Sequence, residues 1–199
     1  GRTGAGKSSL INALAGKYLA EVSDVDPGQQ TAEKHAVYDG DRLIFEVVDT
    51  RGIADGGPGA EEELAEAMRG FQPDLMFLVS PIDDRSHVQE DIRDIVRIRR
   101  QYLHGEIPVI ALLTKMDHVQ PEHEPLNSAG RQANVEAACA RMASLLQAAG
   151  LDPLAIVPVS ANLVWSTDRQ TIVYDGRYNI DKLERLIIDN VEIAAVLQL

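Results

Sequence analysis

The first eight residues constrain this chain more than any other segment. They read Gly1-Arg2-Thr3-Gly4-Ala5-Gly6-Lys7-Ser8 and match the pattern G-x-x-x-x-G-K-[ST]. The glycines let the backbone wrap closely around an anion, which then faces successive N–H groups and the start of a helix. In this pattern the lysine reaches terminal phosphate oxygens and the serine hydroxyl binds Mg²⁺. Residues 7–15 have helical spacing and stop at Gly16, so a helix begins where a phosphate-binding loop requires one.

The rest of the chain alternates between strand and helix patterns. Continuous apolar runs at 75–79, 109–113 and 155–159 predict strands that are covered on both faces. Helical patterns separate these runs, and a last helix is expected at about 180–197. This alternation predicts a P-loop type α/β fold, a three-layer α/β/α domain with a mostly parallel sheet. Strand-like runs at 34–38 and 42–48, joined by Asp39-Gly40-Asp41, add one antiparallel hairpin strand.

We read residues 1–199 as a single domain. Because a phosphate-binding loop normally follows a buried strand, we expect an N-terminal strand that this chain does not contain. Two polar insertions are expected, at 118–130 and 164–179. In the first, His118 and His123 near two glutamates indicate a solvated loop rather than a metal site, since no second ligand pair fits a defined geometry. In the second, Trp165, Tyr174 and Tyr178 could form a partner surface or a small packed flap.

Charge and composition argue against several classes of partner. Nineteen basic and 31 acidic residues give a net charge of −12, so we predict no direct nucleic-acid binding. Cys139 is the only cysteine and cannot form an internal disulfide, which fits a reducing compartment. No run approaches the ~18 apolar residues that span a bilayer. We therefore expect a cytoplasmic protein, and leave open a peripheral membrane attachment through segments absent from this chain.

Three downstream segments give the phosphate loop a family context. Asp49-Thr50-Arg51-Gly52 fits D-x-x-G at a strand end, Thr114-Lys115-Met116-Asp117 fits [NT]-K-x-D after a strand, and Ser160-Ala161-Asn162 fits S-A-[KLN] after the last parallel strand. In this order the motifs resemble Era-like G domains of the translation-factor-related GTPases, over almost the whole chain. Threonine stands at 114 where asparagine is commoner in that family.

The resemblance implies GTP/GDP and Mg²⁺ as ligands. Asp117 would accept hydrogen bonds from the ring N–H and the amine of guanine, donors that adenine lacks at those positions. The Ala161 N–H would contact the guanine O6. The expected nucleotide-binding residues are Gly1, Thr3, Gly4, Ala5, Gly6, Lys7, Ser8, Ser9, Thr114, Lys115, Asp117, Ser160, Ala161 and Asn162. The expected metal-binding residues are Ser8, Thr31 and Asp49, and the expected catalytic residues are Lys7, Thr31 and Gly52.

Hydrolysis is expected to be slow and to need help. Ile53 follows D-x-x-G where some GTPases carry a glutamine that orients water. Gly4 stands where some Era-like enzymes have an asparagine that binds K⁺. Arg2 and Arg51 are read either as charge stabilisers or, more simply, as solvent-facing arginines.

A GTPase switch with an unidentified protein effector is therefore the main hypothesis, and a nucleotide-dependent dimer stays open. The alternatives are a nucleotide-gated binding module with little hydrolysis and an ATP-dependent phosphotransferase.

Overall fold

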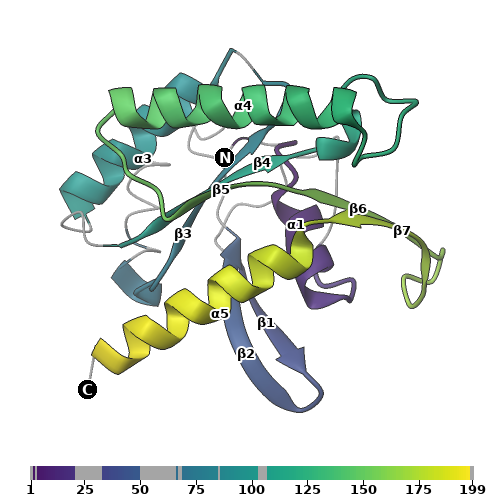
Figure 1. Cartoon of the computed structure of the whole chain (residues 1–199). Coiled ribbons are helices and arrows are strands. Elements are labelled where there is room, and N and C mark those ends of the chain that lie inside the picture. The colour runs from purple at the N-terminus through teal and green to yellow at the C-terminus, as the bar shows by residue number, and fades with distance from the viewer. Residues whose placement is uncertain are drawn as a thin grey trace.

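A three-stranded parallel sheet forms the centre of the molecule. The structure, a computed structural model, describes residues 2, 4–20, 33–49, 66, 69–84, 86–102 and 107–197. The sheet has the order β3 (Met76–Pro81), β4 (Val109–Thr114), β5 (Ala155–Pro158), and α3 (Val88–Tyr102) and α4 (Ala129–Ala148) make the connections between these strands (Figure 1). All three apolar runs are strands, as the sequence predicted.

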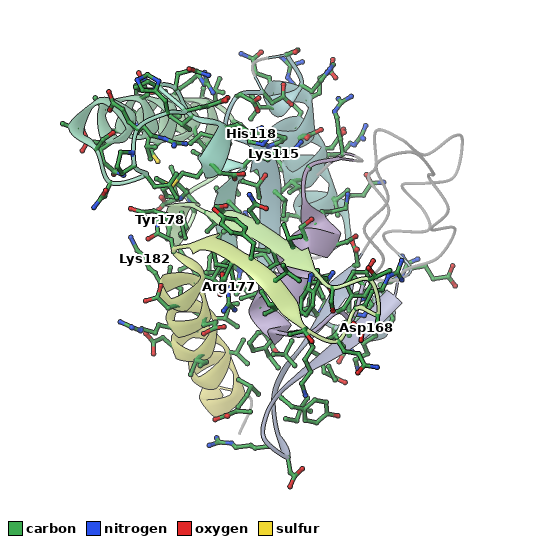
Figure 2. All side chains as sticks on the ribbon, turned by 90° about the vertical axis from the view of Figure 1, so that its right-hand side faces the viewer. Lys115, His118, Asp168, Arg177, Tyr178 and Lys182 are labelled. Carbon is green, nitrogen blue, oxygen red and sulfur yellow. The ribbon has the colours of Figure 1, made fainter. Side chains whose placement is uncertain are left out.

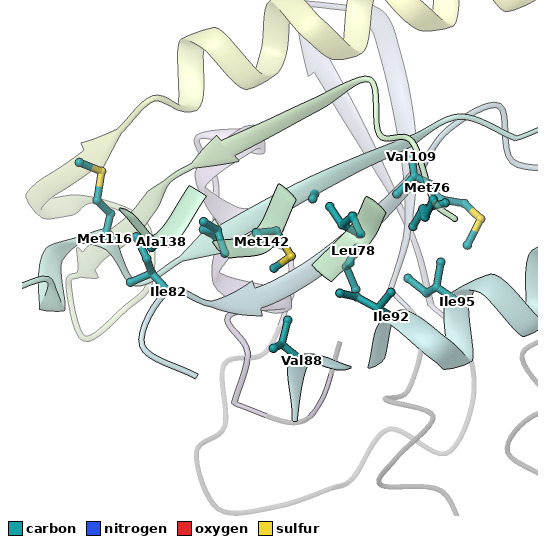
Figure 3. Close-up of a cluster of buried hydrophobic side chains, with 14 of the residues drawn as sticks. Met76, Leu78, Ile82, Val88, Ile92, Ile95, Val109, Met116, Ala138 and Met142 are labelled. Atoms are coloured by element: carbon teal, nitrogen blue, oxygen red, sulfur yellow. The ribbon is translucent and has the colours of Figure 1, made fainter. Parts of the chain in front are cut away.

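Side chains of the central strand alternate between two apolar cores. Val109, Ala111 and Leu113 lie in one core with α3 and α4, which Figure 3 shows in close-up, whereas Ile110 and Leu112 lie in the other. The second core contains α1 (Lys7–Ala15) and α5 (Ile180–Leu197). Every residue of β4 is buried, because helices cover both faces of the sheet. The predicted three-layer α/β/α architecture is confirmed.

An antiparallel hairpin precedes the parallel sheet in the chain. It consists of β1 (Glu33–Asp39) and β2 (Arg42–Asp49), with Asp39 paired to Arg42 across the predicted turn. Gly40 has φ 57°, a left-handed conformation that glycine adopts at little cost.

A second hairpin occupies most of the segment that was expected to be a polar insertion at 164–179. It consists of β6 (Ser160–Trp165) and β7 (Ile172–Tyr178). Arg177 on β7 (labelled in Figure 2) binds Asp175 of the same strand and donates to the Ala13 carbonyl at 3.1 Å. The bond to Ala13 ties the hairpin to α1. The Trp165 ring packs edge-on against Tyr18, with centroids 5.9 Å apart. The segment was expected to form either a partner surface or a small packed flap. Its Trp165 end is packed, whereas Tyr174 is 55% exposed.

The first hairpin and the parallel sheet are separated by a cavity of about 300 Å³. Strand β2, residues 71–77 and Val79 of β3 line its sides, and Leu10 and Ile11 of α1 with Ile187 and Val191 of α5 also line it. Among the described residues, no strand pairs with β2 on the side away from β1 or with β3 on the side away from β4. Two strand edges thus border one space, whose lining combines apolar side chains with charged ones such as Lys34, Glu46 and Asp49. None of the helices in the described ranges is long and apolar enough to cross a bilayer.

Candidate nucleotide-binding site

The phosphate loop leads into α1 without a side-chain cap. Gly6 is the N-cap residue with φ 88°, and Gly4 has φ 74°, so both need the left-handed freedom of glycine. Because no side chain caps the helix, its first N–H groups are left for an anion. Lys7 donates to the Arg2 carbonyl at 2.9 Å, and Ser8 and Ser9 follow in the first turn. Gly1 and Thr3 lie outside the described residues.

A threonine at the end of β4 holds this loop against the sheet. The Thr114 hydroxyl, which is almost fully buried, donates to the Ala5 carbonyl at 2.7 Å. Thr114 belongs to the segment predicted to read the base, while Ala5 belongs to the segment predicted to bind phosphate. One hydrogen bond therefore joins the two halves of the expected site across 109 residues of sequence.

Two of the three residues predicted to bind a metal, Ser8 and Asp49, lie together. The Ser8 hydroxyl donates to Asp49 Oδ2 at 3.2 Å. Asp49 is only 3% exposed, and its Oδ1 atom is buried without a hydrogen-bond partner among the described residues. A buried carboxylate oxygen that receives no hydrogen bond, next to a serine hydroxyl, is a suitable pair of ligands for a hard cation such as Mg²⁺. The other residues predicted around the γ-phosphate, Thr31, Gly52, Arg51 and Ile53, fall outside the described part of the chain.

The segment predicted to read the base forms a tight turn at the carboxyl end of β4. Lys115 has φ 58°, an uncommon value for a residue other than glycine, and the one-turn 3₁₀ helix η2 (Met116–His118) follows it. Asp117 Oδ1 accepts from the Ser160 hydroxyl at 2.9 Å, and Oδ2 accepts from the Asn162 amide at 3.2 Å. The structure thus brings the second and third predicted motifs into direct contact, although they are 43 residues apart.

Residues 160–162 start strand β6 rather than a loop. Ser160 is fully buried, and its oxygen also accepts from the Asn162 N–H at 3.4 Å. Ala161 is partly buried against the core that contains α1 and α5. The strand direction of β6 sends Asn162 towards Asp117, so the hairpin that the sequence analysis missed helps to build this end of the site.

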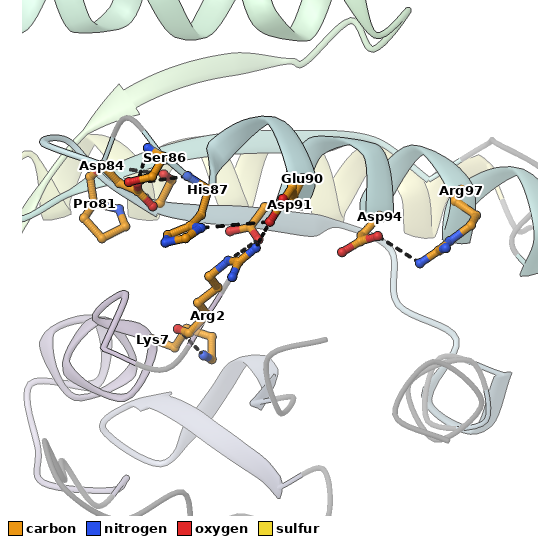
Figure 4. Close-up of polar contacts among 11 residues, drawn as sticks. Arg2, Lys7, Pro81, Asp84, Ser86, His87, Glu90, Asp91, Asp94 and Arg97 are labelled. Carbon is orange, nitrogen blue, oxygen red and sulfur yellow. Dashed lines mark hydrogen bonds and ion pairs between the residues drawn. The ribbon is translucent and has the colours of Figure 1, made fainter. Parts of the chain in front are cut away.

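Arg2 points to α3, as Figure 4 shows. Its Nε atom binds Asp91 Oδ1 at 3.0 Å, and its terminal nitrogen binds Glu90. Burial acts to lower the pKa of Arg2, but the hydrogen bonds to Asp91 and Glu90 outweigh it and raise the pKa above its ordinary value. Arg2 is therefore not a freely solvent-facing arginine, because its side chain is held in ion pairs and is 24% exposed. A role as charge stabiliser stays a prediction.

The histidine-rich insertion shows no sign of a metal centre. His118 and His123 are exposed, and within the described residues no group of three His, Cys, Asp or Glu side chains could hold a metal ion. His118 lies 3.6 Å from Asp117 Oδ2, close enough for an ion pair when the imidazole is protonated (labelled beside Lys115 in Figure 2).

Comparison with known families assigns the chain. The model of a family described as 50S ribosome-binding GTPase matches residues 1–115 of the 199. This chain belongs to that family. The Era-like G domain that the motifs indicated is thereby confirmed, and the P-loop GTPase fold with it. The match ends just before Asp117, so the segments that contact one another around that residue are not covered by it.

Among curated proteins, the chain is similar to tRNA modification GTPase MnmE from several bacteria. It is 32% identical to the Xanthomonas campestris pv. campestris (strain B100) protein over 121 residues, which are 59% of this chain and 27% of that protein. The Chlorobium phaeobacteroides protein is 30% identical over 138 residues, covering 69% of this chain and 28% of that protein. The chain thus spans little more than a quarter of the length of these relatives.

Two solved structures extend the likeness in fold to nearly the whole chain. Era in complex with MgGDPNP and nucleotides of 16S ribosomal RNA superposes with a TM-score of 0.64 at 18% identity, covering 96% of this chain and 54% of Era. A GTP-binding protein from Sulfolobus solfataricus in complex with GDP has a TM-score of 0.58 at 20% identity, covering 98% of this chain and 51% of that protein.

Proposed function

We propose that this domain binds GTP and GDP with Mg²⁺ and hydrolyses GTP slowly as a conformational switch. The observation that carries the proposal is that one short segment, 114–117, contacts both ends of the expected site. At its start Thr114 binds the phosphate loop at Ala5, and at its end Asp117 binds Ser160. A nucleotide that spans this segment would have its phosphates at the start of α1 and its base at Asp117.

Each end of the site has a defined chemical task. Lys7 would bind the terminal phosphate oxygens, and the N–H groups at the start of α1 would donate hydrogen bonds to the phosphates. Ser8, Asp49 and, in the GTP state, Thr31 would hold Mg²⁺, with the Gly52 N–H meeting the γ-phosphate. When bound, Mg²⁺ neutralises charge on the phosphate oxygens. Asp117 would accept from guanine, with Lys115 along the base plane and the Ala161 N–H at O6.

A binding module with little hydrolysis is the second candidate, and Ile53 is the observation that favours it. An isoleucine side chain can neither donate nor accept a hydrogen bond, so it cannot orient the attacking water. Single-turnover hydrolysis of GTP separates the two candidates. A switch converts its bound GTP to GDP before the nucleotide is released, whereas a binding module leaves most of the bound GTP intact. An ATP-dependent phosphotransferase would leave Asp117 without a role.

The partners we propose are guanine nucleotide and an unidentified protein effector, in the cytoplasm, and a nucleotide-dependent dimer stays open. RNA in the Era complex and tRNA modification by MnmE belong to those proteins. The net charge of −12 supports our proposal that this domain makes no direct contact with nucleic acid.

The decisive experiment compares guanine, adenine and xanthine nucleotides in wild type and Asp117→Asn. We expect the wild type to prefer GDP, and the variant to lose GDP and gain XDP, because an amide can donate to the extra carbonyl of xanthine. The loss should be roughly tenfold or more, the usual range when hydrogen bonds to a charged group are lost. Unchanged affinity for GDP in the variant would refute the role of Asp117.

A further inference from the structure

Arg131, in the first turns of α4, is buried in an unusual way. It is 4% exposed, and arginines that are buried this far normally pair with a carboxylate. Here every hydrogen bond from the guanidinium goes to a backbone carbonyl. One terminal nitrogen, Nη1, donates to Glu122 at 3.3 Å and to Glu124 at 2.9 Å, and the other, Nη2, donates to Met116 at 3.2 Å and to Asp117.

These four bonds join two segments of different kinds. Residues 122 and 124 belong to the polar insertion, while Met116 and Asp117 form the turn that presents the carboxylate at the site. Among the described residues, the Nε atom is buried without a hydrogen-bond partner, so within this part of the chain the two terminal nitrogens alone hold the group. Because the guanidinium is planar and rigid, its two ends fix the turn relative to α4 and the insertion.

The turn itself needs external support. Lys115 is held in the left-handed region, at φ 58°, and a non-glycine residue persists there only when its surroundings impose that conformation. On one side, Ser160 and Asn162 bind the Asp117 carboxylate. On the other side, Arg131 binds the backbone carbonyl of the same residue. Asp117 is therefore fixed at both its side chain and its main chain.

We propose that Arg131 is a positioning residue for base recognition: it sets the backbone of Asp117 so that both carboxylate oxygens can face guanine together. The inference rests on the proposed function, since it takes Asp117 as the group that reads the base. Accepting two hydrogen bonds from one planar base tolerates little displacement, because such sites work only when held within about 0.5 Å. Arg131 touches no nucleotide atom in this assignment and acts through Asp117 alone.

Binding of GDP and IDP by the full-length protein tests this role. IDP lacks the exocyclic amine, so the ratio of the two affinities reports the hydrogen bond from that amine to Asp117. We expect the wild type to prefer GDP by about tenfold to a hundredfold, the range for a hydrogen bond to a charged group. We expect Arg131→Met, which keeps the length but removes every donor, to reduce the preference to less than about threefold. A general loss of stability would weaken both nucleotides equally and leave the ratio unchanged.

Two neighbours on α4 provide matched controls. Gln132 donates to the Leu126 carbonyl at 2.6 Å and Asn134 to the Gln120 carbonyl at 2.8 Å. Both therefore hold the same insertion, and among the described residues neither donates to Met116 or Asp117. We expect Gln132→Ala and Asn134→Ala to keep the wild-type ratio. If they reduced it as much as Arg131→Met does, the effect would come from the insertion as a whole and the proposal would be wrong.

A second variant keeps the test decisive if Arg131→Met does not fold. Arg131→Lys preserves the charge, but a single ammonium cannot reproduce the planar fork that reaches both pairs of carbonyls. We expect it to fold and to reduce the ratio by at least about threefold. A wild-type ratio in folded Arg131→Lys and Arg131→Met overturns the proposal. If the wild type binds GDP and IDP equally, both the role of Arg131 and base reading by Asp117 are wrong. The preference for GDP over ADP is a separate measurement, and it tests the proposed nucleotide specificity.

Discussion

At the scale of single residues, Asp49 lowers the stability of the folded protein in a way that suits metal binding. The buried Oδ1 of Asp49 has no donor among the described residues, and Ser8 binds only the other oxygen. A buried carboxylate oxygen without a partner costs folding free energy. The arrangement makes chemical sense if a cation supplies the missing partner when nucleotide is bound.

Asp49→Asn is therefore expected to stabilise the nucleotide-free protein while impairing the site. Removing the buried charge should add about 1 kcal/mol to the free energy of unfolding in the absence of Mg²⁺, because the desolvation cost falls. For a chain of this size that corresponds to about 2–4 °C in Tm. Thermal melts with and without Mg²⁺ and GDP measure both effects, since the variant should lose the stabilisation that Mg²⁺ gives to the GDP complex.

The exposed Asp152 offers a control for the loss of one negative charge. Asp152→Asn should leave both the Tm and the Mg²⁺ effect close to wild type. A lower Tm for nucleotide-free Asp49→Asn would contradict the view that this carboxylate is held at a cost.

At the scale of elements, contacts between distant segments connect the phosphate loop to its surroundings. Thr114 ties the loop to β4, and Arg2 ties it to the start of α3. The Arg2 carbonyl also accepts from Lys7, so the residue that binds α3 through its side chain holds, through its main chain, the lysine predicted to bind phosphate. Movement of α3 would therefore reach Lys7 through a single residue (Figure 4).

Arg2→Ala is expected to accelerate release of GDP by roughly threefold to tenfold, because a partly exposed ion pair contributes modestly. Asp91→Asn should have a smaller effect, because the pair between Arg2 and Glu90 remains. The double variant should be little worse than Arg2→Ala, since Arg2→Ala already breaks the contact with Asp91. Stopped-flow displacement of a fluorescent GDP analogue measures these rates.

Another ion pair on the same helix is the natural comparison. Arg97 binds Asp94 at 2.8 Å, on the exposed surface of α3 and away from the loop. Arg97→Ala should release GDP at the wild-type rate. Equal acceleration by Arg97→Ala and Arg2→Ala would show that α3 stability, and not the link to the loop, controls release.

At the scale of the whole molecule, β2 and β3 line opposite sides of one cavity. Both strands present an unpaired edge in the described structure, and the cavity between them has α1 and α5 in its lining. Neighbouring strands are about 4.8 Å apart, and an extended segment that paired with both edges would complete a continuous sheet. The phosphate loop contacts the carboxyl end of β4 through Thr114, and a segment leading into that loop would therefore run parallel to β3.

In a form of the protein that carries residues before Gly1, we expect those residues to fill this space as a strand. The residues 1–199 would then belong to one domain with a continuous sheet. Amide hydrogen exchange should show stronger protection of β2 and β3 in that form than in the chain that starts at Gly1, because their outer N–H groups gain partners. Affinity for GDP should rise with the protection.

A matched variant keeps the length of the added segment but places prolines at alternate positions. Proline removes the N–H groups that pair with a neighbouring strand, so protection of β2 and β3 should return to the level of the chain that starts at Gly1. Equal protection in all three forms would show that no segment pairs with these edges.

The sequence by itself determined most of the elements, and its motifs predicted the candidate site residues. Helix α1, the β1–β2 turn and the three parallel strands are encoded by local patterns, because periodicity, glycine placement and apolar runs act over a few neighbouring residues. Motif spacing likewise singled out Lys7, Thr114 and Asp117. The β6–β7 hairpin escaped notice because most of its side chains are at least partly exposed and form no long apolar run.

Only the tertiary structure decided how these residues work together. Nothing in the neighbourhood of Arg131 or Asp91 in the sequence marks them, since the first binds backbone carbonyls of a preceding loop and the second binds an arginine 89 residues away. Carbonyl acceptors are present in every residue and leave no trace in a residue pattern. Contacts of this kind exist only after the sheet and helices have brought distant segments together, and for that reason the support of the site became visible in the structure alone.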